Sequence, residues 1–189
     1  DIWFQEQPGP LDPARTRLLF DRSGRISNLP LPAPDASGPA APSRSETAAL
    51  RGQIEEFWRC IALTPPVIGS EEWIVAWQGL QVELGLVLDI LLRGNRIVRD
   101  AGAKKLNQFL PPELRAEIEA ALNLPGFSRA SLVGAHLAFA ALVQRHGREL
   151  AERWGFDYPS ELEEAVLRYV TEELGLLRID VDLPDRGWE

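Results

Sequence analysis

The chain has 189 residues, of which 45% are hydrophobic, and this is enough to bury the core of one domain of ordinary size. Its 28 acidic and 20 basic residues give a net charge of -8, which repels a phosphate backbone and suits a cationic small molecule, so we expect no nucleic-acid partner. No stretch approaches the ~18 uninterrupted apolar residues of a membrane span, and a single cysteine excludes an internal disulfide, so we expect a cytoplasmic protein without a membrane partner.

The first 27 residues predict two short β-strands. Residues 1–4 (DIWF) are typical of the end of a strand, and residues 17–20 (RLLF) run into a turn in which Gly24 supplies the permissive backbone. Residues 28–45 concentrate Pro, Ala, Ser and Gly, and this composition excludes a helix or a central strand. We therefore expect a β-strand unit over 1–27 and a Pro-rich linker over 28–45.

Beyond the linker, apolar residues recur with helical spacing, and five helices are predicted. Ser45 or Thr47 is the expected cap of the first helix, and the sequence TPP at 64–66 is expected to end it. The other four are expected to start near Ser70, Pro111, Ser128 and Pro159 and to end near Gly94, Leu122, Trp154 and Gly175. The predicted fold is mainly α, a helical bundle over 46–175 with a small N-terminal β remnant and a tail over 176–189. A short strand is expected in this tail, over 177–181.

The second predicted helix is apolar nearly all round, which is typical of the central helix of a bundle with neighbours on several sides. Glu71 and Glu72 fall in its expected first turn, where carboxylates suit the helix dipole. Glu83 follows Glu72 by eleven residues and Gly79 by four, so these three can line one face. Glu83 is then either a pocket carboxylate facing a cationic ligand or a metal, or an edge residue where the helix meets solvent.

Four segments in collinear order carry a family resemblance. They are DIWF with LFDRSGRI (1–4 and 19–26), EFW (56–58), AKKL with FLPPEL (103–106 and 109–114), and ELAERWGFDYP (149–159). Together they cover nearly the whole chain and resemble the aminoglycoside 6-adenylyltransferase (streptomycin adenylyltransferase) family of nucleotidyltransferases. The first is similar to the last strand of that family's catalytic domain and the turn after it, and the others are similar to its C-terminal helical part.

The resemblance implies a two-domain enzyme that transfers AMP from ATP to a hydroxyl group of an aminoglycoside-like small molecule. A small mixed sheet would bind ATP and Mg²⁺ through carboxylates, and the helical bundle would help to bind the acceptor. Asp1 falls where the family has a third carboxylate, so the resemblance implies that Asp1 acts as a catalytic base or a metal ligand. The family's Gly-Ser turn and paired Asp motif do not occur in residues 1–189, and the sequence contains no Met. We therefore expect that the sequence is incomplete and that the missing motif lies upstream of Asp1.

The candidate substrate-binding residues are Glu72, Glu83 and Trp77, all in or beside the second predicted helix. Trp77 could stack on a ligand, or it could belong to the core like most tryptophans at helical spacing. The family commonly has Arg and acidic residues after this Trp, whereas QGL follows Trp77 here, which argues against streptomycin itself as the acceptor. Lys104 and Lys105 lie in a predicted loop, where the resemblance implies that one of them reaches a nucleotide phosphate.

Two alternative functions remain open. The chain could be a non-catalytic ligand-binding or scaffold bundle of the same ancestry. It also resembles, less closely, the small HEPN-like RNases of toxin–antitoxin pairs, because Arg129 and His136 are separated by six residues on one predicted helix. In that case Arg129 would stabilise a phosphate and His136 would act as acid or base. Ala130 replaces the polar residue that usually follows the Arg, and the acidic chain does not favour RNA.

Overall fold

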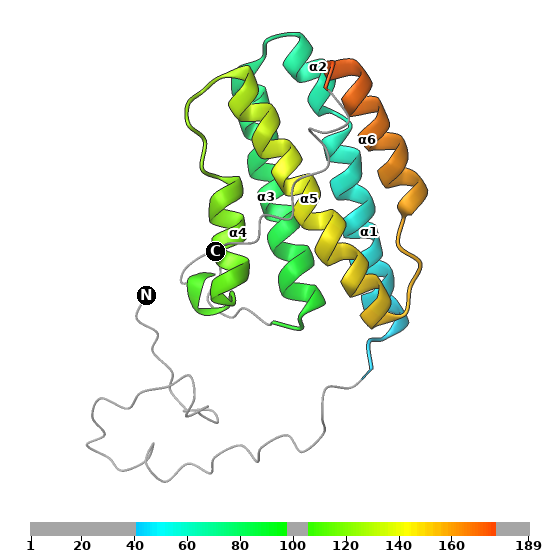
Figure 1. The fold of residues 1–189 in the computed structure, drawn as a ribbon. Coiled ribbons are helices and arrows are strands. Elements are labelled where there is room, and N and C mark those ends of the chain that lie inside the picture. The colour runs from blue at the N-terminus through cyan, green and yellow to red at the C-terminus, as the bar shows by residue number, and fades with distance from the viewer. Residues whose placement is uncertain (1–40, 98–105, 177–189) are drawn as a thin grey trace, which may run out of the picture. The chain divides into compact units, whose positions relative to one another are not determined.

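The computed structural model describes residues 41–97 and 106–176, and the regular elements of this part of the chain are all helical. Five helices have ten or more residues: α1 (Arg44–Ile61), α3 (Trp73–Gly94), α4 (Pro112–Ala121), α5 (Arg129–Trp154) and α6 (Ser160–Leu174). A short helix, α2 (Thr64–Gly69), follows α1, and a 3-10 turn, η1 (Leu106–Gln108), precedes α4. The prediction of a mainly helical bundle is thus confirmed (Figure 1). The strands predicted in 1–27 and 177–181 lie outside the described residues.

Capping residues define the last two helices as the sequence predicts. The side chain of Ser128 accepts a hydrogen bond from the backbone N–H of Ser131 and caps the start of α5. Gly155 and Gly175 follow α5 and α6 with φ angles of 69° and 64°, in the left-handed region that favours glycine. Both predicted ends are therefore confirmed to within one residue.

The first helix begins slightly earlier than predicted. It starts at Arg44, and its cap is Ser43 instead of Ser45 or Thr47. The reason is a reciprocal capping box: the Ser43 hydroxyl accepts from the backbone N–H of Glu46, and the Glu46 carboxylate accepts from the backbone N–H of Ser43. The helix therefore begins within the last residues of the predicted linker.

The sequence TPP at 64–66 begins a helix as well as following one, which corrects the prediction that it acts only as a stop. The helix α1 ends at Ile61, and Thr64 then opens α2, with Pro65 and Pro66 in its first turn. Proline is tolerated at this position because the first N–H groups of a helix have no intrahelical acceptor.

The prediction for the start of the next helix was wrong by three residues, because α3 begins at Trp73 and not near Ser70. The hydroxyl of Ser70 instead donates to the carbonyl of Pro66 at the end of α2. Glu71 has a φ of 60°, and Glu72 is the N-cap, so neither carboxylate lies in the first turn of α3. The chain thus needs residues 70–72 to reverse direction between the two helices.

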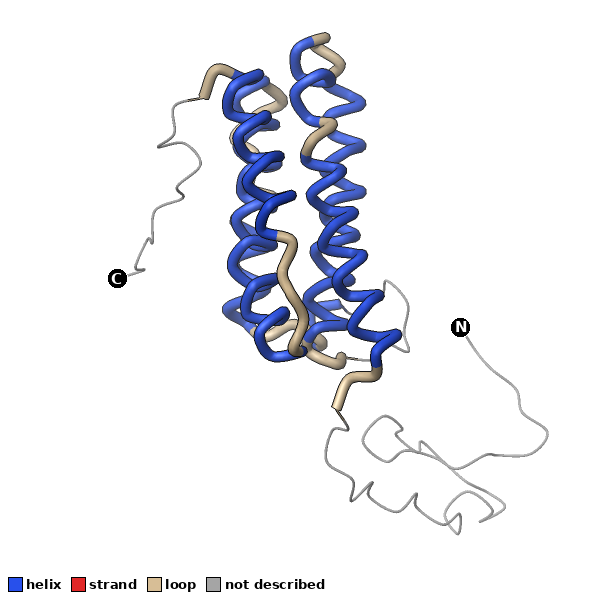
Figure 2. Tube along the Cα trace, turned by 90° about the vertical axis from the view of Figure 1, so that its right-hand side faces the viewer, coloured by secondary structure: helices blue, strands red, loops and turns tan. Residues whose placement is uncertain are grey.

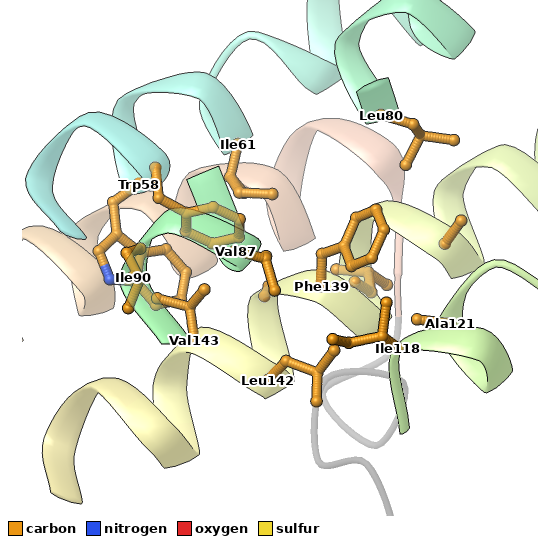
Figure 3. Packing of buried hydrophobic residues seen from close by; sticks show 14 of the residues in the cluster. Trp58, Ile61, Leu80, Val87, Ile90, Ile118, Ala121, Phe139, Leu142 and Val143 are labelled. Carbon is orange, nitrogen blue, oxygen red and sulfur yellow. The ribbon is translucent and has the colours of Figure 1, made fainter. Parts of the chain in front are cut away.

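The long helices run side by side, and the views in Figures 1 and 2 agree on this arrangement. The helix α3 packs most closely on α1 and α5, α4 packs on α5, and α6 packs on α1. Their buried side chains form one hydrophobic cluster, part of which is labelled in Figure 3: Trp58, Ile61, Leu80, Val87, Ile90, Ile118, Ala121, Phe139, Leu142 and Val143. This core fixes the relative positions of all the polar groups considered below.

The helix α3 packs on α1, α2 and α5, in agreement with the prediction of neighbours on several sides, but the rest of its surface is exposed and includes apolar side chains. Ile74 and Val82 are 70% and 56% exposed, and Val75 is exposed as well. The reason is that α1 and α5 cover one side of α3 whereas α4 packs on α5. Among the described helices, α3 alone is long and apolar enough to cross a membrane by length and composition, and 33% of its most apolar window is buried in the bundle.

Candidate functional site

Two polar side chains that are distant in the sequence meet inside the bundle. Glu83 on α3 and His136 on α5 are 1% and 3% exposed. Both carboxylate oxygens of Glu83 lie within hydrogen-bond distance of His136 Nδ1, at 2.8 Å for Oε1 and 2.7 Å for Oε2. The pair therefore joins the two described helices that have the most buried residues.

The helical positions of the pair explain its burial. Glu83 lies one turn from the buried Leu80 and Val87 on α3, and His136 lies one turn from the buried Leu132 on α5. The imidazole also lies against α3 near Gly79, where an added Cβ would be 3.5 Å from His136 Cε1. Each polar group is thus carried into the core by the apolar face on which it sits.

The hydrogen bond determines which imidazole nitrogen carries a proton. A carboxylate has acceptors and no donor, so Nδ1 of His136 donates to Glu83 when the carboxyl group is ionised. The other ring nitrogen, Nε2, is buried and has no hydrogen-bond partner. Burial raises the pKa of Glu83, and the hydrogen bond and charge of His136 act in the opposite direction.

A second polar cluster surrounds Glu163, which is 1% exposed at the start of α6. Its carboxylate accepts hydrogen bonds from Gln144 Nε2 at 2.8 Å, Arg148 Nη2 at 2.5 Å and the Tyr158 hydroxyl at 2.5 Å. The indole N–H of Trp58 on α1 donates to the same Tyr158 hydroxyl at 3.0 Å. The cluster links α1, α5 and α6, and its burial raises the pKa of Tyr158.

The three candidate substrate-binding residues do not share one solvent-facing surface. Glu83 faces the core, Glu72 is exposed at the N-cap of α3, and Trp77 is 36% exposed in the second turn. Trp77 has an aromatic neighbour, because its ring lies 6.3 Å from the ring of Phe127 in the loop before α5, with the planes inclined at 58°. Two of the three candidates, Glu72 and Trp77, are thus accessible to solvent, and so is Phe127 beside Trp77.

The two residues of the RNase alternative make separate contacts. Arg129 Nη2 donates to the backbone carbonyl of Leu174 at 2.9 Å, and the guanidinium thereby joins the start of α5 to the end of α6. The imidazole of His136 is buried against Glu83 and does not face solvent. This geometry does not favour contact between His136 and an RNA strand.

The remaining candidate residues of the site are not described by the structure. Asp1, Lys104 and Lys105 lie outside the described residues. On the surface, Glu117 pairs with Arg145 and His146 between α4 and α5. In the described part of the chain, no group of three or more His, Cys, Asp or Glu side chains could hold a metal ion.

The sequence did not predict the contact between Glu163, which is buried, and Gln144, which is half-buried. A partial signal exists, because Gln144 follows Val143 in a largely apolar helix and Glu163 follows Leu162 near the start of the next one. The contact between them depends on the corner at 155–159 that returns α6 along α5, and a single sequence does not define that angle.

Comparisons with protein-family models, with curated proteins and with solved structures found no match for this chain. The resemblance to the adenylyltransferase family therefore depends on the four collinear sequence segments alone.

Proposed function

We propose that this chain supplies the helical, acceptor-binding half of a nucleotidyltransferase that transfers AMP from ATP to a hydroxyl group of an aminoglycoside-like small molecule. One observation carries the proposal. Trp58 belongs to the EFW segment and Tyr158 to the ELAERWGFDYP segment, and their side chains form a hydrogen bond of 3.0 Å across 100 positions of sequence. Two separate elements of the resemblance thus depend on each other in one fold.

Two further placements support the proposal. The FLPPEL segment contributes Leu110 to the core and opens α4 at Pro112. Trp154, also in the last segment, donates its indole N–H to the carbonyl of Gly94 at the end of α3 at 2.9 Å.

The acceptor-binding role is assigned to the accessible residues near the start of α3. The faces of Trp77 and Phe127 would attract an ammonium group or cover a sugar ring, because an aromatic face carries negative electrostatic potential. Glu72 and the net charge of -8 favour the same cationic class of ligand. Glu83 is buried, so we assign it to the interior pair with His136 and not to ligand contact.

The nucleotide and metal roles of Asp1, Lys104 and Lys105 follow from the resemblance alone. Carboxylates upstream of the bundle would hold Mg²⁺, which would neutralise the phosphate charge of ATP. The described helices contain no metal-binding cluster, so we assign no metal-dependent step to them.

A transfer assay tests the proposal. The full-length protein is incubated with ATP, Mg²⁺ and a panel of hydroxyl-bearing aminoglycosides, and pyrophosphate and the adenylylated product are measured. Pyrophosphate release and a product with the mass of an AMP adduct are expected. Trp77→Ala should raise KM for the acceptor and leave kcat within about twofold, whereas Trp77→Phe, which keeps an aromatic face, should retain most of the affinity.

A binding assay on this chain separates the alternatives. An aminoglycoside should raise the melting temperature in a concentration-dependent way, and a neutral disaccharide of similar size should not. Binding without turnover in the full-length protein would support the non-catalytic scaffold and overturn the transfer reaction. Absence of both binding and turnover would overturn the whole proposal.

A further inference from the structure

The core of the bundle encloses an ionisable pair that has no access to water. Glu83 is 1% exposed and His136 is 3% exposed, and the carboxylate contacts Nδ1 at 2.7 Å. A carboxylate that loses its water is strongly destabilised unless it gains a neutralising charge or a proton. The burial of Glu83 therefore depends on the protonation state of the pair.

Only one protonation state of this pair is electrically neutral. With no titratable proton, an ionised Glu83 beside a neutral His136 leaves one buried negative charge. With two titratable protons, a neutral Glu83 beside the imidazolium of His136 leaves one buried positive charge. With a single proton, either the two charges cancel or both groups are neutral, so a low-dielectric core favours this state.

The unfolded chain does not share this preference, because its glutamate and histidine titrate separately near pH 4.3 and pH 6.5, and above about pH 7 both have lost their protons. We propose that Glu83 and His136 form a proton-binding site inside the bundle, which takes up one proton from solvent when the chain folds and releases it on unfolding. This inference does not depend on the proposed function.

The neighbouring groups do not replace that proton. On α1, the thiol of Cys60 interacts with Glu83, and burial together with the charges of Glu56 and Glu83 raises its pKa. Cys60 is therefore neutral at physiological pH and supplies no positive charge. The Nε2 atom of His136 is buried without a hydrogen-bond partner, so no cationic side chain donates to the pair at this atom.

The direction of the pH dependence follows from the pKa of Glu83, which burial raises above its ordinary value. Between about pH 4.3 and pH 6.5 the folded pair and the unfolded residues each hold one proton, so the stability from the pair is complete there and is lost as pH rises further and the unfolded histidine gives up its proton. For one proton, the folding equilibrium constant falls up to about tenfold for each pH unit above that range.

The test compares unfolding at several pH values. Urea unfolding of the full chain is measured between about pH 5 and pH 9, a range in which the unfolded pair loses its remaining proton near pH 6.5. We expect the folding constant of the unmodified protein to fall more steeply with pH than that of Glu83→Gln, whose amide oxygen still accepts from Nδ1–H but needs no proton. Glu119→Gln is the matched control, because Glu119 is an exposed partner of Arg115 on α4, and it should keep the original slope.

A second measurement needs no variant at position 83. The chain has two histidines, so ¹⁵N NMR shows two imidazoles, and His146→Gln assigns them. The nitrogen shifts of His136 should stay constant between about pH 6 and pH 8, because the folded pair keeps its proton. A His136 spectrum that changes through this range as for a free imidazole overturns the proposal, and so do equal pH slopes for the unmodified protein and Glu83→Gln.

Discussion

The hydroxyl group of Tyr158 belongs to a hydrogen-bond network that connects α1, α5 and α6. It accepts a hydrogen bond from Trp58 on α1 and donates one to Glu163 on α6, and Glu163 is held in turn by Arg148 on α5. Tyr158→Phe leaves the indole N–H and one carboxylate oxygen without this partner. We expect a loss of about 1–3 kcal/mol in the free energy of unfolding, measured by urea denaturation.

The control for this substitution lies on the neighbouring helix. Tyr169 on α6 is 40% exposed, and Tyr169→Phe should change the free energy of unfolding by less than about 0.5 kcal/mol. Equal losses in the two variants would show that the cluster around Glu163 does not hold the helices together.

At the same scale, the sequence indicates which polar residues are unusual but not how they pair. Glu83 stands out in an apolar helix, and His136 stands out on the apolar face of another. Their contact spans 53 positions and depends on the rotation of α3 against α5, which side-chain packing decides. The sequence therefore indicated that a buried Glu83 would need a partner, but it did not indicate that this partner is His136.

At the scale of elements, two glycines in α3 have opposite packing roles. An added Cβ at Gly94 would lie 2.6 Å from Cδ2 of Leu150, a buried side chain on α5, whereas an added Cβ at Gly85 would meet nothing within 4 Å. We expect Gly94→Ala to destabilise the fold by about 1–3 kcal/mol through overpacking. Gly85→Ala should stabilise it by up to about 1 kcal/mol through helix propensity.

Thermal and urea unfolding of these two variants measure both effects in the same helix. A stabilising Gly94→Ala would mean that α3 and α5 move apart at low cost, which would contradict the close contact at the end of α3.

Helix ends were predictable where the signal is local. Gly155 and Gly175 end α5 and α6 because only glycine adopts their left-handed backbone without strain, and this property is visible in the sequence. The boundary between α2 and α3 was not predictable, because Ser70 and Glu71 suit the start of a helix as well as they suit a turn. The carbonyl of Pro66, which accepts from Ser70, decides between these two structures.

At the scale of the whole molecule, α3 has apolar side chains both in the core and on its exposed surface, and only those in the core are expected to stabilise the fold. Ile74 and Val82 are 70% and 56% exposed, whereas Leu80 on the same helix is fully buried. If the bundle alone accounts for the stability of the fold, Ile74→Gln and Val82→Gln should each change the free energy of unfolding by less than about 0.5 kcal/mol. Leu80→Ala should cost about 2–5 kcal/mol, because it removes core contacts and leaves a cavity.

These variants also test whether the exposed apolar side chains of α3 are covered in solution by another part of the chain or by a second molecule. Urea unfolding of the three variants at two protein concentrations separates the outcomes. A large, concentration-independent loss in Ile74→Gln or Val82→Gln would mean that another part of the chain covers this face. A loss that shrinks on dilution would mean that a second molecule does, because association stabilises the unmodified protein only when enough partner is available.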